Sequence, residues 1–195
     1  MAYKPRDERP GYHHVVTRGN NKQAIFVTDA DRRYFLDRLN AVATKHGWEI
    51  LAYCLMRNHY HLLVRVGERG LARGMCELNG SYAIQFNRGH GRINHLFGKR
   101  YWSEYLPDQR RRLNVVRYIV QNPRRAGVDG PLESHTWTSY SAAIGLAFTI
   151  ARFARSELLG LFGNRPDEAV DEFRSFCETA VPSADEASST GRQPP

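Results

Sequence analysis

The spacing of apolar residues predicts an alternation of strands and helices over the first part of the chain. Short apolar runs rich in β-branched and aromatic residues, each ended by turn residues, predict strands at 12–18, 48–55 and 59–66. Between these runs, apolar residues recur three and four positions apart, which predicts helices at 29–46 and 71–87. An aromatic-rich extended segment follows at 95–106. The order is therefore strand, helix, hairpin of two strands, helix and strand.

This order is the split βαβ pattern of ferredoxin-like folds. It predicts an α+β fold with a four- or five-stranded antiparallel sheet and helices on one face. Thr28, followed by acidic residues, is a typical N-cap for the first helix, and Gly47 is a typical residue at its end. A third helix, capped by Asp108 or Asn114, should end before Pro123 because proline disfavours a continuous helix.

Composition divides the chain into three parts. Residues 1–148 contain all of the elements above and form the expected main domain. Residues 149–181 form a predicted helical extension, with an apolar first part at 158–162 and a second helix that opens near Pro166. Residues 182–195 are rich in proline, serine and alanine, which predicts a disordered tail.

Basic residues are concentrated in the expected main domain. The chain of 195 residues has a net charge of +8, and residues 1–148 hold 23 of its 28 Lys and Arg but only 12 of its 20 Asp and Glu. This excess favours a polyanionic partner and argues against a hydrolase for small substrates. No apolar run approaches the roughly 20 residues of a membrane span, the first residues show no signal region, and the three cysteines form no Cys-x-x-Cys pair. We therefore expect a cytoplasmic protein with no membrane partner.

His59 and His61 are the first candidate residues for chemistry. Residues two apart on a strand point to the same face, so the two imidazoles lie side by side while Tyr60 faces away. Two neutral imidazoles on a rigid strand provide part of a site for a divalent metal. Isolated His-x-His pairs are more often structural, so this pair alone does not decide the function.

Tyr118 and Asn122 form the second candidate pair. Positions four apart on a helix share a face, and Gln121 is the neighbour three positions on. A tyrosine oxygen attacks phosphorus when a base or metal helps to remove its proton, and a carboxamide oxygen can complete a metal site begun by two histidines. The residues alone also fit a surface tyrosine and a simple helix end.

Three segments, in order, resemble one known protein family. Residues 12–20 (YHHVVTRGN), 56–64 (MRNHYHLLV) and 118–127 (YIVQNPRRAG) are similar to the main sequence blocks of the HUH single-tyrosine transposases, in particular the REP-associated tyrosine transposases of bacteria. Residues 137–140 (WTSY) resemble a fourth block, so the resemblance covers about residues 10–146. The helices that follow are similar to an extension that some members carry. Arg124 departs from the family pattern, which commonly has an apolar residue there.

The resemblance implies metal-assisted cleavage and rejoining of single-stranded DNA, at hairpin-forming repeats, through a 5′-phosphotyrosine intermediate. Tyr118 would be the nucleophile, and His59, His61 and Asn122 would bind Mg²⁺ or Mn²⁺. The family places a Gln or Asn one turn after the tyrosine, which selects Asn122 over Gln121 as the third ligand. Some relatives exchange the tyrosine helix between subunits and others act as monomers, and the long extension favours a monomer here.

Basic and aromatic residues of the main domain are the expected DNA contacts, because arginine and lysine bind phosphates and exposed rings stack on unpaired bases. The basic candidates are Arg18, Lys22, Arg57, Arg65, Arg88, Arg92, Lys99, Arg100, Arg110, Arg111, Arg112 and Arg124, and the aromatic candidates are Tyr101 and Trp102. On the first strand, His13 or His14 can approach the metal site, although a structural role is favoured for both.

Two other classes of protein fit parts of the pattern. An RRM-like nucleic-acid-binding domain shares the scaffold but needs an aromatic RNP motif on a central strand, where this chain has histidines. Relaxases and replication initiators are also HUH nucleases, but they often carry further domains and paired tyrosines. Formation of a covalent protein–DNA adduct separates a tyrosine nuclease from every non-catalytic module.

Overall fold

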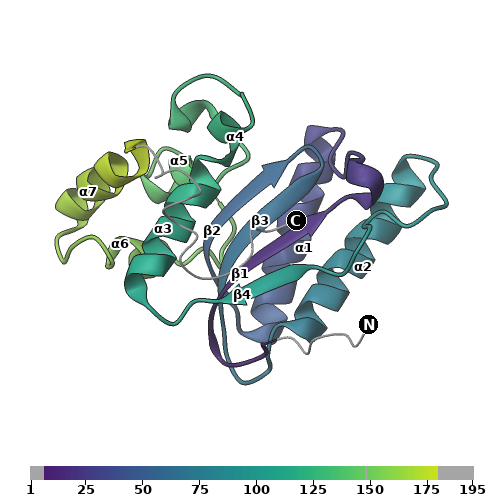
Figure 1. The fold of residues 1–195 in the computed structure, drawn as a ribbon, viewed down its shortest axis with the longest axis horizontal. Coiled ribbons are helices and arrows are strands. Elements are labelled where there is room, and N and C mark those ends of the chain that lie inside the picture. The colour runs from purple at the N-terminus through teal and green to yellow at the C-terminus, as the bar shows by residue number, and fades with distance from the viewer. Residues whose placement is uncertain (1–6, 148, 180–195) are drawn as a thin grey trace.

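One four-stranded antiparallel sheet, in the order β2-β3-β1-β4, forms the centre of the molecule (Figure 1). The computed structural model describes residues 7–147 and 149–179. The sheet and its first helices are β1 (Gly11–Arg18), the 3-10 helix η1 (Asn20–Lys22), α1 (Asp29–His46), β2 (Glu49–Met56), β3 (His59–Val66), α2 (Ala72–Gly89) and β4 (Trp102–Tyr105). The helices that follow are α3 (Gln109–Val120), α4 (Asn122–Arg125), the 3-10 helix η2 (Leu132–Ser134), α5 (Tyr140–Ala143), α6 (Arg155–Leu159) and α7 (Pro166–Glu178). The predicted α+β, ferredoxin-like class is confirmed.

Local sequence signals set the ends of α1 and its packing against the sheet. Thr28 and Asp31 form a reciprocal capping box, in which each side chain accepts a hydrogen bond from the other residue's backbone N–H. Gly47 ends the helix with a left-handed conformation (φ 69°), which glycine adopts without strain. α1 and α2 then cover one face of the sheet and bury residues such as Phe35 and Leu62.

The opposite face of β2 and β3 is covered by α3 and the C-terminal helices, so the expectation of helices on one face holds for α1 and α2 alone. Leu51 and Leu63 point to this second face and pack with Val116, Ile119 and Phe173. The cause is the apolar run of β3, whose successive residues point to opposite faces, so both faces must be covered.

Residues 149–179 of the expected extension pack into this second core. α6 and α7 contribute Leu158, Phe173 and Cys177 to it, and Phe153 forms a bridge beside Ile50 of β2. The predicted tail, 182–195, lies outside the described residues. Within the part of the chain that the structure describes, no helix is long and apolar enough to cross a membrane.

Candidate active site

The histidines of β3 lie on the sheet face that α3 covers. The β-hairpin brings His59 directly after the turn, and strand alternation sends Tyr60 to the other face, where its hydroxyl donates to Asn79 at 2.6 Å. His59 and His61 have ring centroids 5.0 Å apart. The predicted shared face of the two imidazoles is therefore present, at the end of β3 that follows the hairpin turn.

A chain of hydrogen bonds fixes the tautomer of His59. The Asn58 amide donates from Nδ2 to the Lys22 carbonyl at 3.1 Å, so Asn58 Oδ1 is left as an acceptor. This oxygen lies 2.7 Å from His59 Nδ1, which must carry the ring proton and donate it. His59 Nε2 then has a free lone pair, and it lies 3.3 Å from Oδ1 of Asn122, another acceptor.

His61 is oriented from both sides. Its Nε2 lies 3.3 Å from Asn122 Nδ2, and its Nδ1 lies 3.1 Å from His14 Nε2. With Asn122 Nδ2 as a donor, the His61 proton sits on Nδ1 and is donated to His14. Both Nε2 lone pairs of the β3 histidines therefore face the carboxamide of Asn122.

Burial keeps these imidazoles uncharged at neutral pH. Loss of hydration lowers the pKa of His59 and lowers that of His61 well below its usual range, and the nearby Arg18 acts in the same direction on both. Burial also lowers the pKa of His14 to about 3. Neutral imidazoles have the lone pairs that a metal ion requires.

Tyr118 lies over the histidine cluster. It is half-buried in α3, and its ring centroid is 5.4 Å from that of His61 and 6.0 Å from that of His14, edge-on in both cases. The Arg125 guanidinium carbon lies 5.1 Å from the centroid of the same ring. The phenol is thus beside the imidazoles while remaining accessible.

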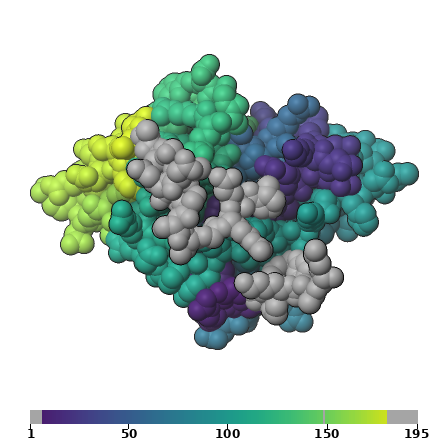
Figure 2. Space-filling view, in the orientation of Figure 1, coloured from purple at the N-terminus to yellow at the C-terminus, as the bar shows by residue number. Residues whose placement is uncertain are grey.

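Gln121 and Asn122 point to different partners although they are adjacent. α3 ends at Val120 and α4 begins at Asn122, so the helix is interrupted before Pro123, as the sequence predicts. Gln121 donates from Nε2 to the backbone carbonyls of Cys177 and Thr179, the latter at 2.9 Å. This side chain is therefore tied to the end of α7, whereas the Asn122 side chain faces the histidines. In the space-filling view, α7 (yellow) lies against the green segment that follows α3 (Figure 2).

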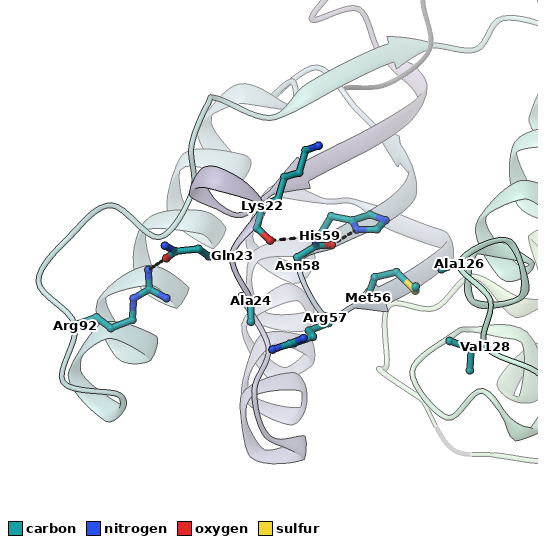
Figure 3. Close-up of a pocket in the computed structure, with 10 residues that line it drawn as sticks. All are labelled: Lys22, Gln23, Ala24, Met56, Arg57, Asn58, His59, Arg92, Ala126 and Val128. Carbon is teal, nitrogen blue, oxygen red and sulfur yellow. Dashed lines mark hydrogen bonds between the residues drawn. The ribbon is translucent and has the colours of Figure 1, made fainter.

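A basic groove of about 630 Å³ begins at His59. Lys22, Arg57 and Arg92 line it on the side of η1 and the β2–β3 turn, and Ala126 and the neighbouring Val128 line the other side (Figure 3). No acidic side chain lines this groove in the described part of the chain. Its basic lining suits a polyanion.

The other predicted DNA contacts are scattered. Arg65 and Arg124 are held by the extension, in ion pairs with Glu157 at 2.9 Å and Glu178 at 2.7 Å. Lys99 and Arg100 are exposed in the loop before β4, Arg88 is exposed on α2, and Arg110, Arg111 and Arg112 lie at the start of α3.

The two candidate aromatic rings lie differently. Trp102 of β4 is partly exposed and packs edge-on against His14, with ring centroids 5.4 Å apart. Tyr101 is only 7 % exposed and belongs to the core between the sheet and helices α1 and α2, so the expectation of an exposed stacking ring is wrong for this residue.

Two residues near the site, Asn58 and Arg125, did not stand out in the sequence, and the sequence favours a structural role for His14. His14 contacts His61 because β1 pairs with β3 in the register that places Val16 beside His61. Asn58 fixes the His59 tautomer, and its position in a tight turn was the only signal. Arg125 lies over Tyr118. It directly follows Arg124, and the sequence alone does not show which of these two arginines lies at the site.

The donor set fits a divalent cation. His59 Nε2 and Asn122 Oδ1 are two acceptors only 3.3 Å apart, an arrangement that a cation between them would satisfy. Among the described residues, no three His, Cys, Asp or Glu side chains are grouped to hold a metal ion. A third ligand in this cluster would therefore come from the Asn122 carboxamide.

A family model described as "Transposase IS200 like" matches residues 10–122. Among solved structures, the chain is similar to a REP-associated tyrosine transposase bound to a REP hairpin, with a TM-score of 0.62 and 18% identity over 85% of this chain and 98% of that chain. A putative transposase from Deinococcus radiodurans R1 matches with a TM-score of 0.43 and 14% identity, over 67% of this chain and 100% of that chain. No curated protein matches the chain.

Proposed function

Because this chain belongs to the IS200-like transposase family, we propose that it cleaves and rejoins single-stranded DNA through a 5′-phosphotyrosine intermediate on Tyr118. The observation that carries the proposal is the meeting of Tyr118 and Asn122 with His59 and His61. These residues come from a helical segment and a strand far apart in sequence, yet their side chains lie in one cluster. A structural tyrosine or a structural histidine pair would not need this convergence.

The proposed reaction is an in-line displacement at phosphorus. The Tyr118 oxygen forms a bond to the scissile phosphorus as the bond to the 3′ oxygen breaks, and the phenolic proton ends on the departing 3′-OH. The product is a phosphodiester between Tyr118 and the 5′ end of the downstream strand. A 3′-OH can later attack this phosphotyrosine and release the tyrosine, so strands are rejoined without an external energy source.

Mg²⁺ or Mn²⁺ is the proposed cofactor, held by His59, His61 and Asn122. Such an ion supplies charge neutralisation at the scissile phosphate. Imidazole ligands favour Mn²⁺ over Mg²⁺ intrinsically, so availability would decide which ion is used. The Asn58 and His14 contacts described above hold the two rings with Nε2 toward Asn122, which is the orientation that binding requires.

Single-stranded DNA next to a hairpin is the proposed partner. The basic groove supports it, because Lys22, Arg57 and Arg92 line this groove together with His59. The structurally similar transposase is described as bound to a REP hairpin. A monomer is proposed because Tyr118 and the histidines of one chain already lie together.

The test is incubation of the full chain with Mn²⁺ and an end-labelled hairpin oligonucleotide that has single-stranded flanks. A covalent adduct that survives denaturing electrophoresis, together with a free 3′-OH on the other product, is the expected result. The flanking sequences tested include those of repeats beside its own gene. If the chain binds all of these strands reversibly and forms no adduct with any of them, it is a non-catalytic binding domain.

Single-strand binding should weaken steeply as salt is raised, because basic side chains displace counterions from phosphates. Four to six phosphate contacts would give a slope of log K against log salt of about −3 to −4. Arg57→Ala should reduce that slope by about 0.7, the value for one lost phosphate contact. Fluorescence anisotropy at several salt concentrations measures both values.

The matched control is Arg69→Ala, because Arg69 bonds the Lys45 carbonyl beyond the other end of β3. It should leave the slope unchanged. Binding that is independent of salt would contradict the electrostatic account of the groove.

Asn122→Ala and Gln121→Ala should have different effects. Asn122→Ala should raise the Mn²⁺ concentration for half-maximal cleavage at least about tenfold, because the carboxamide is a proposed ligand. Gln121→Ala should leave that concentration unchanged and lower the free energy of unfolding by about 1–3 kcal/mol, because two carbonyls lose their donor. Metal titrations and urea unfolding measure the two effects. A larger metal effect from Gln121→Ala would make Gln121 the ligand instead.

A further inference from the structure

Arg125 lies against the face of the tyrosine that the proposed function makes the nucleophile. Its guanidinium carbon is 5.1 Å from the centroid of the Tyr118 ring. The same ring is edge-on to His61, which belongs to the proposed metal site. The residue after Arg125, Ala126, lines the basic groove. Arg125 therefore lies over the phenol ring, and the residue that follows it lines the groove.

The charge of Arg125 is available, unlike that of its neighbour. Arg125 is exposed, and no described carboxylate or other hydrogen-bond acceptor binds its guanidinium. Arg124 binds Glu178 at 2.7 Å and the Gly130 carbonyl at 3.1 Å, so its charge is already paired. The two adjacent arginines therefore differ in what they can bind.

The break between α3 and α4 directs Arg125 toward the tyrosine. The backbone N–H of Arg125 donates to the Gln121 carbonyl at 3.1 Å, and the Gln121 side chain is anchored on the end of α7. Asn122 faces the histidines from the same short helix. One anchored turn thus orients both a proposed metal ligand and the free arginine.

Packing alone does not account for this arginine. A cation over an aromatic ring contributes little at an exposed position. A guanidinium has five donors in a planar fork that matches two phosphate oxygens, and here none of them has a described partner. A phosphorus atom under attack lies about 3–3.5 Å from the tyrosine oxygen, and the guanidinium lies over the ring that carries this oxygen.

We propose that Arg125 is a further catalytic residue, whose guanidinium binds a non-bridging oxygen of the scissile phosphate while Tyr118 attacks. It stays on the phosphate after the 5′-phosphotyrosine has formed and neutralises its charge until a 3′-OH reverses the reaction. The proposal rests on the proposed function and adds one charged group to it. In this role Arg125 differs from Arg124, which is one of the arginines expected from sequence to contact phosphate.

The test compares Arg125→Met, Arg125→Lys and Arg124→Met in the full chain under single-turnover conditions with saturating oligonucleotide and Mn²⁺. Arg125→Met keeps the aliphatic stem beside the Tyr118 ring but removes the charge. We expect its saturated cleavage rate to fall about 10²–10³-fold, as for loss of one donor that stabilises a transition state. Its dissociation constant for the strand, its Mn²⁺ midpoint and its melting temperature should stay close to those of the unaltered chain.

Arg125→Lys should cleave at least about tenfold faster than Arg125→Met because it restores a cation. Arg124→Met should cleave at least about tenfold faster at saturation than Arg125→Met, since the Arg124 charge is paired with Glu178. The proposal is overturned if Arg125→Met cleaves within about threefold of the unaltered chain. It is also overturned if lysine restores nothing, or if the loss appears only as weaker binding or a lower melting temperature.

The proposed function itself can fail separately. If the unaltered chain forms no adduct with any of the hairpin oligonucleotides, the proposed function and the role of Arg125 are both excluded. If it forms the adduct and Arg125→Met forms it at the same rate, only the role of Arg125 is excluded.

Discussion

Tyr118→Phe should abolish both the covalent protein–DNA adduct and strand cleavage. The substitution removes one oxygen and keeps the ring, so the edge contacts with His14 and His61 and the fold should survive. A ring carbon cannot replace the nucleophile, so the rate should fall by about 10³-fold or more. Denaturing electrophoresis of a labelled strand measures the adduct, and circular dichroism confirms that the variant is folded.

Tyr60→Phe is the matched control, because Tyr60 lies between the two candidate histidines in sequence but points to the opposite face of the sheet. Its hydroxyl contacts Thr17 and Asn79 on the face that α1 and α2 cover, and burial raises its pKa. This variant should lose about 1–3 kcal/mol of stability through those contacts and still form the adduct. Persistence of the adduct in Tyr118→Phe would mean that another tyrosine attacks.

His61→Ala and His59→Ala should each lose metal-dependent cleavage while retaining single-strand binding. Each change removes one of the two lone pairs that face Asn122, and with it most of the metal affinity. We expect the cleavage rate to fall about 10²–10³-fold at fixed Mn²⁺, which is the size of effect seen when charge stabilisation at a transition state is lost. Parallel cleavage and anisotropy measurements separate the two properties.

His13→Ala is the control for this pair. His13 is buried on the same strand as His14, but its Nε2 lies 2.8 Å from the Arg9 carbonyl on the other face. It should reduce stability and leave the metal dependence of cleavage unaltered. Cleavage that continues at the normal rate in His59→Ala or His61→Ala would exclude a metal site on β3.

Local sequence patterns were sufficient for the order of strands and helices in the sheet domain and for part of the site. The period of two in β3 put His59 and His61 on one face, and the turn at Arg57 and Asn58 made the hairpin, because strand alternation and turn geometry depend on near neighbours. The cap at Thr28 and the interruption before Pro123 are similarly local. The family match over 10–122 agrees with the family that residues 12–20, 56–64 and 118–127 resemble.

Contacts between distant segments were decided only by the tertiary structure. His14 reaches His61 through strand register, and Gln121 binds α7, 56 residues later in the chain. Arg65 and Arg124 look like free phosphate ligands in sequence, yet the extension pairs both of them with carboxylates. Spacing along a chain fixes which face a side chain occupies, but not which distant group meets that face. That depends on strand register and helix packing, and here they left Arg125 free beside Tyr118.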